Sequence, residues 1–158
     1  MTSGRQEAPG GVETTCMRGE ASRSFVDTNV LVYAYDVSAG RKHDLARDLI
    51  TELWDSRTGC ISVQVLQELF VVLTQKVGQP MDAEGAQAIV SDLSTWEVCV
   101  PDADDVLEAI ALNRQASVSF WDAMIVSCAA KLGCDTFYSE DLSHEETYAG
   151  VRVVNPFL

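Results

Sequence analysis

The stretch SFVDTNVLVYAY, residues 24–35, decides the fold that we expect for this chain. Its apolar start ends at Asp27, two polar residues follow, and apolar residues then return at helical rather than strand spacing. This pattern predicts a buried strand that ends in a carboxylate, followed by a short helix that Thr28 or Asn29 caps. Because open α/β sheets bind ligands at the carboxyl ends of their strands, Asp27 is a candidate for chemistry or metal binding.

Short apolar segments alternate with longer helical patterns along the rest of the chain. We expect helices over about residues 41–55, 63–76, 82–93, 103–115 and 119–132, and strands at about 60–61, 96–100, 134–138 and 151–154. This alternation predicts an α/β fold with a parallel sheet and helices on both of its faces. Residues 1–22 lack apolar periodicity and are expected to be a disordered extension, so that the folded domain spans residues 23–158.

The charge balance limits the kinds of partner that the protein can have. Lys and Arg number 11 against 24 Asp and Glu, which gives a formal net charge of −13. A field of this sign repels nucleic acid at long range, so nucleic-acid binding needs a local basic patch or cations held by the acids. The composition therefore disfavours a simple electrostatic nucleic-acid binder and leaves a metal-dependent nuclease open.

Cysteine usage and hydropathy indicate the compartment. Five cysteines occur, at positions 16, 60, 99, 128 and 134, without a Cys-x-x-Cys pair. Several lie in apolar stretches, which favours small buried side chains over a disulfide or zinc framework and fits a reducing cytoplasm. No stretch approaches the ~20 apolar residues that a membrane helix needs, and the amino terminus lacks the apolar core of a signal peptide. We therefore expect a cytoplasmic protein without membrane contact.

Two acids interrupt patterns that are otherwise apolar. Glu68 lies within an apolar helix and is expected to face packed protein, where a carboxylate needs a cation, hydrogen-bond donors or a raised pKa; a helix-edge Glu is the alternative. Asp122 follows Ser119 by three residues, so helix capping and catalysis are both open roles. Phe120 and Trp121 favour catalysis, because we expect them to embed this helix start in the core.

The acids become more informative as a set. Asp141 follows the expected strand at 134–138 and by itself indicates only a polar turn. However, Asp27 and Asp141 would follow strands of one parallel sheet, Asp122 would open the helix between them, and Glu68 would come from a helix after a further strand. Four converging carboxylates repel each other unless divalent cations lie between them, and oxygen ligands select Mg²⁺ or Mn²⁺ over zinc. The set outlines a site for metal-assisted hydrolysis of phosphodiester bonds.

Four short motifs, in this order, resemble those of the PIN-domain nucleases. They are FVDTNV at 25–30, QELF at 67–70, FWDA at 120–123 and YSEDL at 138–142. Each motif is weak alone, but four at fitting spacings are specific. The ending VVNPF at 153–157 also resembles the VapC-type toxin branch. The resemblance covers about residues 23–158 and implies a three-layer α/β/α sandwich with a mainly parallel central sheet.

The resemblance also implies an endoribonuclease that depends on Mg²⁺ or Mn²⁺. Its acidic, catalytic metal site would consist of Asp27, Glu68, Asp122 and Asp141, with Thr28, Asn29 and Ser139 as polar neighbours of these acids. The implied partners are an RNA substrate, a second copy in a homodimer, and an antitoxin protein that neutralises the enzyme. The metal ions would activate a water for attack on phosphorus, so no histidine is required.

Substrate contacts are less clearly indicated. Arg41, Lys42 and Arg47 belong to the densest basic group and are candidate phosphate contacts, with a solvated helix face as the alternative. His43 and His144 are expected at the surface rather than in catalysis.

Other functions remain open beside a toxin. A PIN-like nuclease in RNA processing, or one that acts on DNA, would use the same acids. A non-catalytic acidic module would use them only to bind a basic partner peptide. Phosphatase-type α/β folds are excluded because they need a second Asp where Asn29 stands, and a dinucleotide-binding fold is excluded because no G-x-G-x-x-G turn follows the first strand.

Overall fold

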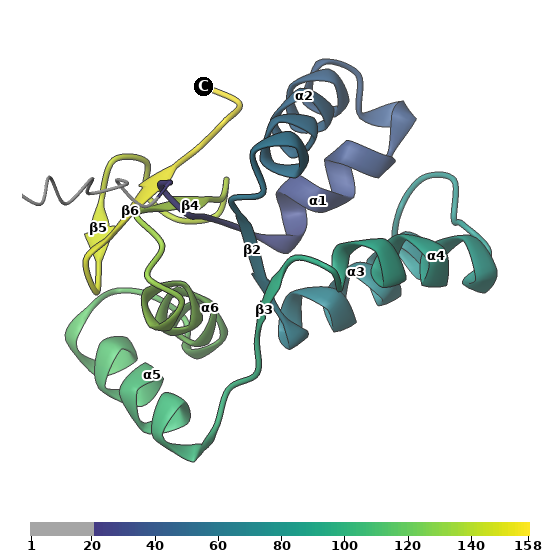
Figure 1. Cartoon of the computed structure of the whole chain (residues 1–158). Coiled ribbons are helices and arrows are strands. Elements are labelled where there is room, and N and C mark those ends of the chain that lie inside the picture. The colour runs from purple at the N-terminus through teal and green to yellow at the C-terminus, as the bar shows by residue number, and fades with distance from the viewer. Residues whose placement is uncertain (1–20) are drawn as a thin grey trace, which may run out of the picture.

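The computed structural model describes residues 21–158, and within them six strands form one sheet in the order β3-β2-β1-β4-β6-β5. The strands are β1 (Ser24–Val26), β2 (Gly59–Ser62), β3 (Glu97–Cys99), β4 (Thr136–Tyr138), β5 (Thr147–Tyr148) and β6 (Val151–Val154). The α-helices are α1 (Thr28–Tyr35), α2 (Arg41–Ser56), α3 (Val63–Gln75), α4 (Ala83–Leu93), α5 (Ala103–Gln115) and α6 (Phe120–Lys131), with a 3-10 turn η1 (Val37–Ala39). Helices α1 and α2 lie on one side of the sheet and α5 and α6 on the other (Figure 1).

The predicted three-layer α/β/α fold is confirmed. All strands pair in parallel except β5, which runs antiparallel to β6. Residues 1–20, which make up most of the predicted extension, lie outside the described residues. None of the helices in residues 21–158 has the length and apolar composition to cross a membrane.

The strand order reverses beside β1, and this positions the site. From β1 the chain proceeds to β2 and β3 at one edge, and then returns through α5 and α6 to β4 on the other side of β1. Phe25 in β1 is in register with Cys60 of β2 and with Phe137 of β4. In open α/β sheets, the crevice for ligands lies at the carboxyl ends of the strands where the order reverses. Here that point falls at the residues that follow β1 and β4.

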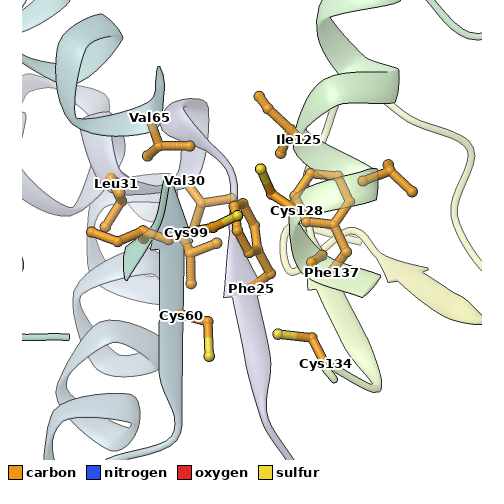
Figure 2. Packing of buried hydrophobic residues seen from close by; sticks show 14 of the residues in the cluster. Phe25, Val30, Leu31, Cys60, Val65, Cys99, Ile125, Cys128, Cys134 and Phe137 are labelled. Carbon is orange, nitrogen blue, oxygen red and sulfur yellow. The ribbon is translucent and has the colours of Figure 1, made fainter. Parts of the chain in front are cut away.

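Apolar side chains pack on both faces of β1. The rings of Phe25 and Phe137 meet edge to face with centroids 5.5 Å apart, and Cys128 of α6 lies close to them (Figure 2). Cys60, Cys99, Cys128 and Cys134 are all buried and free, which confirms the expectation of buried thiols for these positions. Cys16 lies outside the described residues.

The short strand β5 was not predicted. Thr147 pairs with Arg152 and Tyr148 with Val151, so Ala149 and Gly150 form a two-residue hairpin loop. Both loop residues have positive φ, 49° and 80°, as a type I′ turn requires. The usual sequence signal for such a turn is Asn-Gly or Asp-Gly, and Ala-Gly does not provide it.

Gly59 at the start of β2 is where we expect a side chain to be least tolerated. A Cβ atom built there would lie 2.5 Å from the ring of Trp96, which itself packs edge to face on Trp54. Gly59→Ala is therefore expected to lower the free energy of unfolding by about 1–3 kcal/mol through overpacking. Urea unfolding followed by circular dichroism measures this change. Gly78→Ala is the matched control, because its nearest neighbour would be the Ser38 hydroxyl at 3.8 Å; equal stability of the two variants would contradict the prediction.

Candidate active site

Asp27 lies at the point where the strand order reverses and is the most buried acid of the site. It is 6% exposed and is itself the N-cap of α1, with φ −73° and ψ 156°. Its Oδ1 accepts a hydrogen bond from the Thr28 amide at 2.7 Å, and its Oδ2 accepts one from the Ser139 hydroxyl at 2.7 Å. The expectation that Thr28 or Asn29 caps the helix was wrong, because the extended backbone of Asp27 already directs its carboxylate at the first helical amide.

Burial raises the pKa of Asp27 from 3.8 to about 7. The hydrogen bonds from Ser139 and Thr28 act in the opposite direction, and the negative charges of Asp141 and Asp122 add to the increase. A cation beside Asp27 would remove this charge penalty, since an opposite charge favours the ionised carboxylate.

Glu68 reaches the same region from α3. Its Oε2 accepts a hydrogen bond from the Thr28 hydroxyl at 2.8 Å, and its Oε1 accepts one from the Gln64 amide at 3.0 Å. The expectation that Glu68 faces packed protein was wrong, because it is half-buried and lines an open pocket. One side of α3 is uncovered in the chain, and the neighbouring Val71 is 38% exposed. Hydrogen-bond donors rather than packing hold this carboxylate.

Asp122 stands at the third position of α6, where Ser119 accepts a hydrogen bond from its amide at 3.1 Å. At α5 the pair Asp102 and Asp105 forms a reciprocal capping box. Within residues 21–158, no such return bond runs from the Ser119 amide to the Asp122 carboxylate. The Asp122 carboxylate instead lines the pocket.

The expectation that Trp121 helps to embed the start of α6 in the core was wrong. Its side chain is 64% exposed, whereas Ala123 to Ala129 are all buried. Successive residues of a helix point about 100° apart, so Trp121 and Ala123 point about 200° apart. Since Ala123 points into the core, Trp121 points away from it. Its indole lies along the same pocket as the acids.

Asp141 follows β4 and is joined to Asp27 by two polar side chains. The Asn29 amide donates to Asp141 Oδ2 at 2.9 Å and approaches Asp27 Oδ2 at 3.4 Å. The Ser139 hydroxyl, which donates to Asp27, also accepts from the Asp141 amide at 3.1 Å. Asn29 and Ser139 therefore position the two acids relative to each other.

The structure brings the predicted acids together. A pocket of about 320 Å³ is lined by Asp27, Glu68, Asp122 and Asp141, together with Thr28 and Asn29. Ser139 is fully buried behind Asp27. Each acid comes from a different segment: the end of β1, α3, the start of α6, and the end of β4.

The predicted basic residues lie outside the pocket lining, although Lys42 donates to the hydroxyl of Tyr33, a lining residue, at 3.5 Å. Arg41, Lys42 and Arg47 do not line the pocket. Lys42 forms an ion pair with Glu140 at 2.7 Å, and Arg47 pairs with acids on its own helix. Their contact with RNA stays a prediction. His43 and His144 are also outside the pocket.

Two polar side chains of the site were missed from the sequence. Gln64 holds Glu68 from one helical turn earlier, and this i, i+4 spacing on α3 could have identified it. Tyr33 lines the pocket and donates a hydrogen bond to Glu140 at 2.6 Å. Tyr33 and Glu140 are more than a hundred positions apart, so no local pattern in the sequence indicates their contact.

The oxygen atoms that line the pocket are suitable ligands for a hard divalent cation. They are carboxylate, amide and hydroxyl oxygens, which suit Mg²⁺ or Mn²⁺. Asn29 Oδ1 is buried and has no hydrogen-bond partner in residues 21–158, so an acceptor beside Asp27 and Asp141 is left unused. As they stand, no three His, Cys, Asp or Glu side chains in this part of the chain are arranged to hold an ion. Binding an ion would therefore require these acids to adjust their positions.

A larger pocket lies at the opposite, amino-terminal end of the strands. It measures about 440 Å³ and is lined by Trp54 and Trp96 with Arg23 and Arg57. It contains a single carboxylate, Glu97. It therefore lacks the converging acids that make the smaller pocket the candidate active site.

Comparison with known proteins identifies the family. Residues 24–150 match the PIN domain, so the chain belongs to the PIN-domain family and the resemblance of the four motifs is confirmed at that level. Comparison with curated proteins gave no match.

Solved structures of toxin–antitoxin proteins have a similar fold. A toxin–antitoxin complex from Klebsiella pneumoniae matches with TM-score 0.61 and 22% identity, over 84% of this chain and 97% of that chain. VapBC2 from Rickettsia felis, bound to a DNA fragment from its promoter, matches with TM-score 0.59 and 20% identity. The match covers 82% of this chain and 96% of that chain. VapC20 from Mycobacterium tuberculosis, a toxin that cleaves the sarcin-ricin loop, matches with TM-score 0.56 and 18% identity. The match covers 82% of this chain and 98% of that chain.

Proposed function

We propose that this protein is an endoribonuclease that depends on Mg²⁺ or Mn²⁺ and acts as the toxin of a toxin–antitoxin pair. The observation that carries the proposal is the convergence of four carboxylates from four segments in one pocket. Membership of the PIN-domain family supports a nuclease, and the similar fold of VapC20, which cleaves an RNA loop, supports RNA as the substrate.

The chain's own residues divide into acids and the groups that hold them. Asp27, Glu68, Asp122 and Asp141 would bind the cation, which when present would neutralise the acids and promote attack of water on phosphorus. Ser139 holds Asp27 from behind, and Asn29 fixes its distance from Asp141. Thr28 and Gln64 orient Glu68.

The chemistry requires no side-chain nucleophile. In hydrolysis, water attacks phosphorus and the 3′ oxygen leaves, so the products carry a 5′-phosphate and a 3′-hydroxyl. With a cation bound, Asp27 would be ionised, so its role would be to hold the cation rather than to transfer a proton.

We further propose an antitoxin partner and a homodimer. An open groove of about 520 Å³ between α3 and α4 is apolar and is lined by Leu66, Phe70, Val71 and Val90 among others. A soluble chain gains by covering such a surface with protein. The groove supports contact with a protein partner, whether a second copy of the chain or an antitoxin.

Cleavage of a mixed RNA pool by the purified chain tests the proposal. Cleavage that requires Mg²⁺ or Mn²⁺, stops in EDTA and leaves 5′-phosphate ends is the expected result. A folded protein that binds Mn²⁺ but cuts DNA rather than RNA would support the alternative nuclease function. A folded protein that neither cuts nucleic acid nor binds Mn²⁺ would support a non-catalytic acidic module.

A further inference from the structure

The pocket that holds the four acids also has an apolar half. Val32 of α1, Val72 of α3, and Trp121 and Ile125 of α6 line it beside the carboxylates. The acids account for a cation and a phosphate, but they do not account for this apolar surface. Its apolar composition is suited to contact a second, apolar group on the ligand.

Trp121 is the most exposed member of this apolar half. Its side chain is 64% exposed, and its ring meets that of Phe120 edge to face with centroids 5.1 Å apart. Such a contact restrains the indole, and its high exposure leaves most of the ring accessible to a ligand. Because Trp121 directly precedes Asp122, the indole and this acid enter the pocket from the same turn of α6.

Charge alone does not provide affinity for RNA at this site. Among the described residues, neither Lys nor Arg lines the pocket, and the whole chain carries a net charge of −13. Proteins that bind single-stranded nucleic acid combine two sources of affinity, which are cationic contacts to phosphates and stacking of bases on aromatic rings. Because no Lys or Arg side chain supplies the first source within the pocket, stacking gains weight as the second source.

We propose that Trp121 stacks on a nucleobase next to the phosphate that is cut, and that the apolar half of the pocket is a nucleobase subsite. This inference rests on the proposed ribonuclease function and adds a requirement on its substrate. A base can reach the indole only when it is not stacked in a duplex, so the enzyme cuts where a nucleotide is unpaired. Because every base has a π face, the subsite tolerates different sequences.

Kinetics of Trp121 variants test the subsite. We expect Trp121→Ala to lower kcat/KM for a single-stranded oligoribonucleotide that the wild type cuts, by a factor of roughly 5 to 150, the range for one stacked base. Trp121→Phe should recover most of the loss, because it restores an aromatic face. Leu107→Ala is the matched control: Leu107 is 63% exposed on α5, outside the pocket, and its loss should leave kcat/KM unchanged.

An abasic substrate separates stacking from other effects of the substitution. Removing the base beside the cut should lower wild-type kcat/KM by a similar factor, and Trp121→Ala should then cause no further loss. Independent, multiplying losses would overturn the inference, because they would mean that indole and base do not contact each other. A fully paired duplex should be cut poorly by the wild type; equal cleavage of duplex and single strand would also overturn it.

Two further outcomes are distinguishable. If Trp121→Ala cuts RNA at the wild-type rate but is inhibited less by a basic, apolar peptide, the apolar half serves a protein partner and the nucleobase subsite is wrong. If the wild type neither cuts nor binds the oligoribonucleotide, the proposed function itself fails, and this inference fails with it. Thermal melting of each variant confirms that it is folded.

Discussion

Asp27→Asn is expected to lower the rate of RNA cleavage by at least about three orders of magnitude, roughly 4 kcal/mol of activation free energy. Asn keeps the size of the residue; its oxygen can accept from the Thr28 amide, and its amide can donate to the Ser139 hydroxyl, which reverses the direction of the present bond from Ser139. The substitution therefore removes the charge and leaves the geometry. Single-turnover cleavage of the RNA pool in Mg²⁺ or Mn²⁺ measures the effect.

The matched control for this prediction is Asp55→Asn, which removes the same charge from an exposed position near the end of α2. It changes the net charge of the chain equally but lies outside the pocket. We expect it to cut RNA at the wild-type rate. Cleavage by Asp27→Asn at the rate of Asp55→Asn would exclude Asp27 from the reacting site.

The fold could be predicted because its signals are local. The helix predicted at about residues 103–115 is present as Ala103–Gln115, and in the structure Asp102 caps its start. The parallel sheet followed from strands that alternate with helices. The hairpin of β5 was missed because its turn is Ala149 followed by Gly150, with positive φ at a residue that rarely adopts it.

The site could be predicted only in outline, because its decisive contacts join distant segments. Asp105 and Asp122 both stand three residues after a helix cap. Asp105 completes a capping box and binds Lys131 at 2.6 Å, whereas Asp122 lines the pocket. Local spacing is the same in both cases, so the sequence left capping and catalysis open for Asp122. The bond from Thr28 to Glu68 likewise spans forty positions.

Trp121 shows a second limit of sequence reasoning. Because Trp121 is a large aromatic residue, the sequence favoured burial of its side chain. That prediction did not take into account which face of the helix the side chain occupies. The apolar residues of α6 follow it almost without interruption, so periodicity could not assign its direction. The structure places it at the rim of the pocket, where its exposed ring becomes available to a substrate.

The ionisation of Asp27 is expected to cost the cation-free protein stability as pH rises from about 4 to about 7, so its contribution is measured as the difference between the wild type and Asp27→Asn. Burial raises the pKa of Asp27 from 3.8 in the unfolded chain to about 7 in the folded one, so the folded state holds this proton more tightly. The stabilising contribution of the protonated group is fully present below pH 4 and is lost as pH rises through 7. The difference corresponds to roughly 4 kcal/mol at pH 8.

Urea unfolding in EDTA at pH 4 and at pH 8 measures this loss. Asp27→Asn cannot ionise, so at pH 8 it should be more stable than the wild type by a few kcal/mol, and at pH 4 the two should be nearly equal. Asp55→Asn is again the control, because it removes one exposed carboxylate that lies outside the pocket. Equal stability of wild type and Asp27→Asn at pH 8 would contradict the prediction.

If the four acids bind Mn²⁺, the ion should offset the loss of stability that the ionised Asp27 causes. At a concentration of about 100 times its Kd, a cation that binds only the folded state adds about 2.7 kcal/mol of stability. We expect the melting temperature of the wild type at pH 8 to rise in Mn²⁺ and that of Asp27→Asn to rise much less. The substitution would then stabilise the free protein and remove its activity together, because the charge that is unfavourable in the empty fold is the charge that the reaction uses. If Mn²⁺ leaves the melting temperature of the wild type unchanged, the acids do not bind the ion. The ionisation of Asp27 would then affect the stability of the protein but not cation binding.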